Sequence, residues 1–212
     1  MKTLIIFRGK NIRYEPYWSS INLIKNWNKT IFADLKKNNI NYDIALVTYE
    51  SEILDDLKNI LNAKYIITEG FHTQIENFNV LSNLMLETHK EYDRFVICRF
   101  DYRYRYKITK WPSWNENGII ITSRDPSVNF YSDILFICDS NSIEDWMNAT
   151  KSITMWPHQL GQYLFVNQIP FHLMYNDAAY GRDLHPLYSA IEEDEPNLKK
   201  PISDSKIRRY CC

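Results

Sequence analysis

Glycine is scarce in this chain, because only 5 of its 212 residues are glycine. Two phosphate-binding motifs depend on closely spaced glycines, G-x-G-x-x-G and G-x-x-x-x-G-K-[ST], and neither occurs in the sequence. The chain therefore carries neither the dinucleotide fingerprint of Rossmann domains nor a P-loop.

Cysteine is also scarce, and its spacing excludes two further classes of protein. No C-x-x-C pair and no zinc-finger spacing occurs among the 4 cysteines. Neither a zinc site nor a disulfide framework is indicated, so we expect a reducing compartment, the cytoplasm. Two cysteines lie in apolar runs and two are adjacent near the last position: Cys98, Cys138, Cys211 and Cys212.

Long apolar runs and an excess of one charge are missing too. No window approaches the length of a membrane span, and the apolar run at residues 4–7 is too short for a signal-peptide core. The formal net charge of −1 argues against bulk electrostatic binding to nucleic acid or to an anionic membrane. We therefore expect a soluble protein with no membrane span and no nucleic-acid partner.

Aromatic residues, by contrast, are plentiful at 15% of the chain, with 15 Tyr and 6 Trp. Such rings form flat apolar platforms in sugar-binding sites, but tyrosine also fills protein cores. The length of 212 residues and the 45% of hydrophobic residues suit one globular domain, or one with a small appendage.

Apolar periodicity predicts an alternation of strands and helices. We expect strands at residues 3–7, 42–49, 64–68 and 95–101, separated by helices at 18–37, 51–61 and 75–90. Further strands are expected at 118–122, 132–138 and 170–175, with helices at 142–152 and 159–167. The first half predicts a parallel sheet, and the short connection between 122 and 132 requires an antiparallel strand.

The predicted fold is therefore α/β, a single domain with a mixed, mostly parallel central sheet flanked by helices. The domain is expected to cover residues 1–190. Residues 191–212 are acidic and then rich in proline and lysine, which is typical of a linker or a frayed tail.

The most informative stretch is residues 92–106, where a buried strand runs into alternating charges. The apolar run at 95–98 is followed by Arg99, Asp101, Arg103 and Arg105. In an open α/β sheet, ligands bind at the carboxyl ends of the strands. A carboxylate surrounded by guanidinium groups there suits a phosphate, held directly or through a metal ion. A strand end with a solvated charge cluster would show the same pattern.

The order and spacing of these motifs resemble the GT-A fold of nucleotide-sugar-dependent glycosyltransferases. An Asp-x-Asp motif closes the fourth strand in that family, and here Asp101 matches its first position while Arg103 takes the second. The resemblance implies Mn²⁺ or Mg²⁺ on the diphosphate at Asp101, with Arg103 taking over part of the neutralisation. It also implies a nucleotide-binding half at 1–101 and a sugar and acceptor half at 102–190.

The second half is similar to the retaining subset of that family, which includes glycogenin and bacterial galactosyltransferases. The resemblance implies that Asp133 and Gln159 hold sugar hydroxyls or steady positive charge at the anomeric carbon. It implies that His158 contacts the leaving diphosphate or the acceptor, and that His185 is a late metal ligand. Each also has a simpler reading: Asp133 as a turn cap, His158 as a helix cap and His185 as an exposed histidine.

The donor site implied by this resemblance lies at the ends of the first, second and fourth strands. Its residues are Phe7, Arg8, Gly9, Thr48, Tyr49, Arg99, Asp101 and Arg103. Gly9 directly after a buried strand would let the backbone turn sharply or approach a ligand closely. Arg8 could instead pair with a surface carboxylate.

The predicted function is metal-assisted, retaining transfer of a sugar from a UDP-sugar to a glycan or glycoprotein acceptor. The chain is also similar to small bacterial capsule-type and viral glycosyltransferases, including those of large DNA viruses of algae, which would place it in a host cytoplasm. Two alternatives remain open: a sugar nucleotidyltransferase and a non-catalytic domain that binds glycan or nucleotide. A single-stranded nucleic-acid binder that uses the Arg-Tyr alternation is disfavoured by the net charge.

Overall fold

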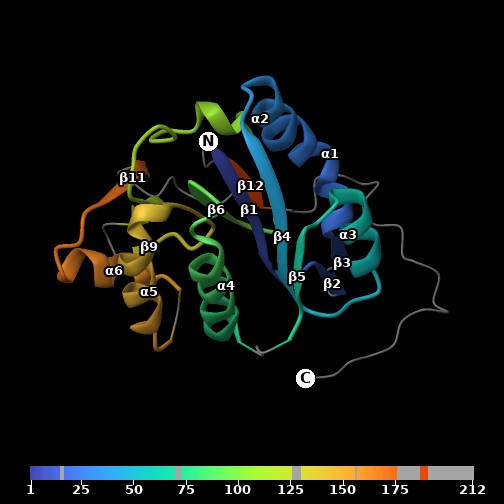
Figure 1. Cartoon of the computed structure of the whole chain (residues 1–212). Helices are drawn as coiled ribbons and strands as arrows, with labels where there is room; N and C mark the ends of the chain where they lie inside the picture. Colours follow the sequence, from blue (N-terminus) through green and yellow to red (C-terminus); the bar gives the residue numbers. More distant parts are fainter. Residues whose placement is uncertain (15–16, 70–72, 126–129, 156, 176–186, 191–212) are drawn as a thin grey trace.

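The computed structural model describes residues 1–14, 17–69, 73–125, 130–155, 157–175 and 187–190 (Figure 1). Within these ranges the chain forms an α/β unit around an eight-stranded sheet, which confirms the predicted class. The strands of this sheet are β1 (Lys2–Gly9), β4 (Asn41–Thr48), β5 (Tyr65–Ile67), β6 (Arg94–Arg99), β8 (Ile119–Asp125), β9 (Phe130–Tyr131), β10 (Leu135–Asp139) and β11 (Phe171–Tyr175).

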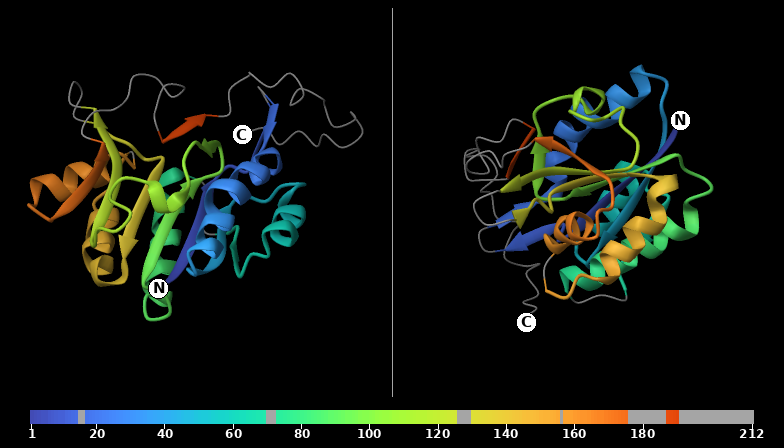
Figure 2. Two further views of the ribbon diagram at one scale, coloured as in Figure 1. Left: turned by 90° about the horizontal axis from the view of Figure 1, so that it is seen from above. Right: turned by 90° about the vertical axis from the view of Figure 1, so that its left-hand side faces the viewer.

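Helices lie on both faces of the sheet (Figure 2). They are η1 (Ser20–Leu23), α1 (Ile24–Trp27), η2 (Asn28–Phe32), α2 (Ala33–Lys37), α3 (Leu54–Leu61), α4 (Gln74–Thr88), η3 (Ile108–Lys110), η4 (Ser140–Ser142), α5 (Ile143–Lys151) and α6 (Gln159–Val166). None of the helices in these ranges combines the length and the apolar character that crossing a bilayer requires.

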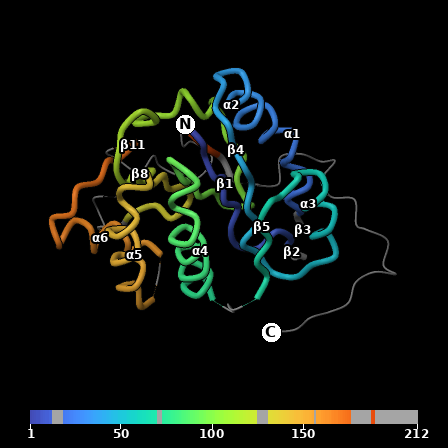
Figure 3. The backbone as a smooth tube through the Cα atoms, viewed as in Figure 1, coloured from blue at the N-terminus to red at the C-terminus, as the bar shows by residue number. Residues whose placement is uncertain are grey.

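The strand order is β11-β8-β10-β6-β1-β4-β5, with β9 paired to β8. β1, β4, β5 and β6 are parallel, whereas β10 runs antiparallel to both β6 and β8, as the short connection predicted. The chain moves outward from β1 to β4 and β5 and then returns to β6 on the other side of β1 (Figure 3). The ends of β1 and β6 therefore flank the point where the direction of winding reverses, which is where open α/β sheets bind ligands.

Two separate hydrophobic cores result from the alternation of side chains along the strands. In β1, Ile5 and Phe7 belong to the core under α1, α2 and α3, while Leu4 and Ile6 belong to the core under α4, α5 and α6. Because successive side chains in a strand point to opposite faces, Arg8 lies on the α4 face. The same alternation in β6 places Arg99 on that face.

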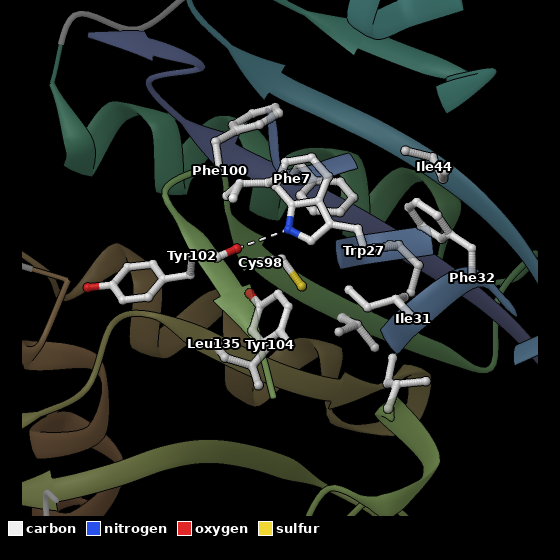
Figure 4. Close-up of a cluster of buried hydrophobic side chains, with 14 of the residues drawn as sticks. Phe7, Trp27, Ile31, Phe32, Ile44, Cys98, Phe100, Tyr102, Tyr104 and Leu135 are labelled. Atoms are coloured by element: carbon white, nitrogen blue, oxygen red, sulfur yellow. Dashed lines mark hydrogen bonds between the residues drawn. The ribbon is translucent and has the colours of Figure 1, made fainter. Parts of the chain in front are cut away.

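The first core is rich in aromatic rings (Figure 4). The ring of Phe7 lies 4.4 Å from that of Trp27 and 5.6 Å from that of Phe100, measured between centroids. The indole nitrogen of Trp27 donates a 2.9 Å hydrogen bond to the carbonyl oxygen of Tyr102. Trp111 and Trp114 are buried as well, so these two rings of the 107–117 excursion pack on the domain.

Several element boundaries differ from those predicted. The fourth strand ends at Arg99, not at Asp101, because Phe100 and Asp101 form a turn. The predicted helix at 18–37 is a continuous helical stretch only from Ser20, and it contains a π-helical turn at η2. Five short strands of the described residues escaped prediction because two or three residues cannot show a period: β2 (Ile12–Tyr14), β3 (Tyr17–Ser19), β7 (Tyr102–Tyr104), β9 and β12 (Tyr188–Ala190). The predicted tail at 191–212 lies outside the described residues.

Candidate functional site

Four charged side chains meet at the carboxyl ends of β1 and β6. They are Arg8, Arg99, Asp101 and Asp133, called here the arginine–aspartate cluster. Arg8 and Arg99 are direct neighbours in the register of the parallel pair β1–β6. Asp101 lies in the turn after β6, and Asp133 lies between β9 and β10. The antiparallel return of β10 beside β6 brings Asp133 to Arg8, 125 positions earlier in the chain.

Arg8 is the buried centre of the cluster, with a side chain that is 2% exposed. Its guanidinium donates hydrogen bonds to the carbonyl oxygen of Asp133 and, at 3.3 Å, to Oδ2 of the same residue. It also lies 4.3 Å from the centroid of the Phe78 ring on α4. Burial lowers the pKa of Arg8 to about 10, partly offset by Asp133, so the group remains charged near neutral pH.

Asp133 is also buried, and two arginines hold it. Both of its carboxylate oxygens lie 3.3 Å from Nη1 of Arg99, and Oδ2 accepts from Arg8 as well. Burial by itself would raise the pKa of Asp133, but the positive charges of Arg99 and Arg8 hold it below its ordinary value. The carboxylate is therefore ionised and fully engaged with guanidinium groups.

Arg99 and Asp101 form the solvent-facing side of the cluster, with side chains 20% and 27% exposed. Nε of Arg99 donates to Oδ1 of Asp101 at 2.8 Å and Nη2 donates to Oδ2 at 2.6 Å, which is the bidentate geometry of a strong guanidinium–carboxylate pair. Burial would lower the pKa of Arg99, but Asp133 and Asp101 outweigh it and raise that pKa. The guanidinium thus spans both carboxylates.

His158 approaches the cluster from the start of α6. Its Nδ1 lies 2.6 Å from the carbonyl oxygen of Tyr131 and 4.0 Å from Oδ1 of Asp133. Gly161, one turn further along α6, sets this approach, because a Cβ added there would lie 2.3 Å from an atom of the Tyr131 ring. The sequence analysis did not single out Gly161, although a glycine inside a predicted helix signals close packing.

The other predicted donor residues lie around the ends of β1 and β4. The hydroxyl of Thr48 donates to the carbonyl oxygen of Gly9 at 2.8 Å, and the amide of Asn11 donates to the carbonyl oxygen of Tyr49 at 3.2 Å. Gly9 has a φ of +90°, a conformation that favours glycine, and no atom lies within 4 Å of a Cβ built on it. Space next to the backbone is thus open at this strand end.

The burial of two predicted site residues, Phe7 and Asp133, bears on their roles. Phe7 is fully buried in the aromatic core, so its side chain supports the strand and does not face a donor site. The alternation along β1 that puts Arg8 at the site puts Phe7 on the opposite face. Asp133 is 5% exposed and both of its carboxylate oxygens contact Arg99, which suits a positioning residue, and its predicted contact with the sugar stays a prediction.

Three further predicted residues lie outside the cluster. The side-chain oxygen of Gln159 accepts from the backbone N–H groups of Thr154 and Met155 at 3.0 and 2.8 Å, which joins α6 to the loop before it. Arg103 is half-buried in β7, opposite Ser189 of β12. His185 lies outside the described residues.

The described residues do not fit a divalent metal ion. They contain no group of three or more His, Cys, Asp or Glu side chains that could hold one. Both oxygens of Asp101 already accept from Arg99, and Asp133 is shared between Arg99 and Arg8. Hard cations take several oxygen ligands, and here each carboxylate is occupied by a fixed positive charge.

A cavity of about 590 Å³ lies elsewhere, at the amino end of β4 between α2 and α3. Its lining includes Phe32, Tyr42, several asparagines and two charged side chains, Lys36 and Asp43, and Asp43 pairs with Lys2 and Lys64, whose side chains are 40% and 39% exposed. The arginine–aspartate cluster, by contrast, contains an almost completely buried ion pair, Arg8 with Asp133. Functional sites concentrate charged groups in perturbed, partly buried surroundings. We therefore place the candidate site at the arginine–aspartate cluster and not at this cavity.

Comparisons with known proteins give a fold likeness only. No family model matches the chain, and no curated protein matches it in sequence. Among solved structures it is similar to a “putative nucleotide-diphospho-sugar transferase” from Desulfovibrio desulfuricans G20, with 11% identity and a TM-score of 0.45 over 84% of this chain and 81% of that chain. A likeness of this size carries no functional conclusion, so we infer function from the residues of this chain.

Proposed function

We propose that the protein transfers a sugar from a nucleotide-diphosphate donor, UDP-sugar, to a glycan or glycoprotein acceptor. One observation carries the proposal: two arginines lie side by side at the ends of β1 and β6, where the winding of the sheet reverses. One of them, Arg99, is partly exposed, whereas Arg8 is buried behind it. The motif order from Arg99 to His158 that resembles GT-A enzymes supports the same proposal.

The bond that breaks in such a transfer joins the anomeric carbon to the diphosphate, and negative charge grows on the departing phosphate oxygens. Preorganised positive charge at that place lowers the barrier. Arg99 supplies it in this proposal, because its guanidinium is charged, oriented by Asp133 and accessible to solvent. Asp133 then acts as a positioning residue for Arg99 and Arg8.

The open backbone at Gly9 receives the nucleoside in this proposal, beside Thr48 and Tyr49 at the end of β4. The uracil and ribose would then lie next to the strand ends while the diphosphate faces Arg99. His158, whose Nδ1 lies 4.0 Å from Oδ1 of Asp133, contacts the acceptor or the leaving diphosphate in this proposal. The experiment below identifies the donor sugar.

The test is the release of UDP from a panel of UDP-sugars by the folded protein, with UDP binding measured in parallel by calorimetry. We expect slow release from one sugar donor and a loss of about tenfold or more in Arg99→Ala. Lys58→Ala is the matched control, because Lys58 is an exposed cation on α3, away from the cluster. A folded protein that binds no UDP would overturn the proposal, and UDP binding without release from any donor would favour the non-catalytic nucleotide-binding domain.

A further inference from the structure

We infer that Arg99 binds the donor diphosphate directly by exchanging its partner Asp101 for phosphate oxygens, with no divalent cation between protein and phosphate. This inference rests on the proposed function and concerns how the same site recognises its anionic ligand. It departs from the metal-bridged site that the Asp-x-Asp resemblance implies. Contacts, burial and charge balance in the arginine–aspartate cluster carry it.

The contacts of Asp101 indicate which kind of ligand the partly exposed guanidinium of Arg99 can bind. The guanidinium of Arg99 donates hydrogen bonds to both carboxylate oxygens of Asp101, at 2.8 and 2.6 Å, as a bidentate pair. Guanidinium groups bind phosphate oxygens in the same paired geometry. The carboxylate of Asp101 therefore occupies the place that a phosphate would take on Arg99.

The two carboxylate partners of Arg99 differ in burial, so Asp101 can be exchanged for phosphate while Asp133 stays in place. Asp101 sits in a turn with a side chain 27% exposed, so it can leave Arg99 for water. Asp133 is 6% exposed at its side chain and stays in contact with Arg99 through Nη1. The guanidinium thus keeps its orientation when Asp101 departs. The incoming phosphate replaces the two hydrogen bonds that Arg99 loses with Asp101, so the exchange leaves the guanidinium paired.

Charge balance disfavours a metal ion at the same place. The two guanidinium groups and two carboxylates of the cluster carry no net charge, and Arg8 cannot withdraw because it is buried against Phe78. A divalent cation on Asp101 would have to displace Arg99 and then sit beside it, where like charges repel. A diphosphate, by contrast, compensates the positive charge that the departure of Asp101 exposes.

The first measurement is calorimetric titration of UDP into the wild-type protein, once with EDTA and once with Mn²⁺. We expect dissociation constants that agree within about twofold, because no ion bridges the phosphate. Uridine is the control ligand, since it lacks the diphosphate. Binding that appears only with Mn²⁺ would overturn the inference while leaving the proposed function standing.

The second measurement separates the two models by the sign of one effect. Asp101→Asn removes the competing carboxylate, so we expect UDP to bind more tightly, by about threefold to tenfold, in EDTA. A metal-bridged site predicts the reverse, because the substitution removes a ligand. Asp145→Asn on α5 is the matched control, since Asp145 is exposed and outside the cluster.

Arg99→Lys completes the series, with correct folding verified by circular dichroism and thermal unfolding. Lysine keeps the charge but loses the paired donors, so we expect UDP affinity to fall by about tenfold while uridine affinity is unchanged. Weaker binding of UDP to Asp101→Asn than to wild type would overturn the inference alone. Absence of UDP binding by the folded wild-type protein, with or without Mn²⁺, would overturn this inference and the proposed function together.

Discussion

The two ends of the parallel strands carry charge clusters of opposite character. At the carboxyl end, Arg8 and Asp133 are almost completely buried, with side chains 2% and 6% exposed. At the amino end, Lys2 and Asp43 pair at 3.1 Å with side chains 40% and 29% exposed, and Lys64 contacts both Asp43 and Glu91. β1 thus begins at an ion-pair network in contact with solvent and ends at the buried arginine–aspartate cluster.

Because the two clusters differ in burial, they are expected to contribute differently to the stability of the protein and to ligand binding. Exposed ion pairs are screened by water and salt, so each is expected to contribute less than about 1 kcal/mol. Buried pairs are costly to desolvate, and the loss of one partner leaves the other charge uncompensated. A protein gains no simple stability from placing a buried arginine, Arg8, beside a second, partly exposed arginine, Arg99, at the ends of two strands. The position of these two arginines, at the point where ligands bind in open sheets, is therefore an argument for function.

Arg8→Ala is expected to produce the largest effect. It removes the partner of Asp133 and opens space against Phe78, so the free energy of unfolding should fall by about 3–5 kcal/mol. Urea denaturation followed by circular dichroism measures this change.

The counterpart at the amino end is Lys64→Ala, which also removes one cation from an ion-pair network. It should cost less than about 1 kcal/mol, because the side chain of Lys64 is 39% exposed. Equal losses in the two variants would show that burial does not distinguish the two ends, and the comparison would fail.

Gly161→Ala tests how tightly the carboxyl-end cluster depends on α6. The new methyl group would collide with the Tyr131 ring, so we expect a loss of about 1–3 kcal/mol from overpacking. His158 should move with the helix, because its Nδ1 contacts the carbonyl oxygen of Tyr131. Gln162→Ala is the control, since Gln162 is exposed on the same helix.

Denaturation and the NMR shift of the His158 ring together report on Gly161→Ala. An unchanged His158 signal with a stability loss below about 0.5 kcal/mol would mean that α6 does not position the cluster.

Most of the fold could be predicted from the sequence because burial follows local periodicity. The strands at β1, β4 and β6 and the helix α4 show apolar patterns that need no knowledge of distant partners. An antiparallel strand at 118–122 or 132–138 could be predicted as well, because the nine residues between these two predicted strands are too few for a helical crossover.

The members of the cluster could also be named from the sequence, but their contacts could not. Asp133 reaches Arg8 through the pairing of β10 with β6, which depends on strand order and not on local pattern. The bidentate pair between Arg99 and Asp101 depends on the turn that begins at Phe100, which local sequence patterns do not predict. Phe7 was predicted to line the donor site together with Arg8, but the alternation of side chains along a strand places these two neighbours on opposite faces of the sheet.

The smallest expected effect concerns acid and salt, and it distinguishes the two ends by screening. The pKa of Asp43 is lowered below 3.8, because the hydrogen bond from Tyr92 and the charges of Lys2 and Lys64 outweigh burial. The stability that this shift provides is fully present above the unfolded value and is lost as the pH falls through the folded pKa. The same sign applies to Asp133, whose pKa is also lowered.

Urea denaturation at about pH 6 and about pH 3, in low salt and in about 1 M NaCl, separates these contributions. We compare the decrease in the free energy of unfolding on acidification in wild type and in Asp43→Asn. In low salt this decrease should be smaller in the variant by less than about 1 kcal/mol, and in high salt the two proteins should not differ measurably, because the partners of Asp43 are solvated. The acid-induced loss that remains in this variant should persist in high salt, since Asp133 and Arg8 are shielded from ions. If salt abolished the entire acid dependence, the carboxyl-end cluster would be as exposed as the amino-end network. The direct binding of phosphate by a guanidinium held in place from behind would then lose its structural basis.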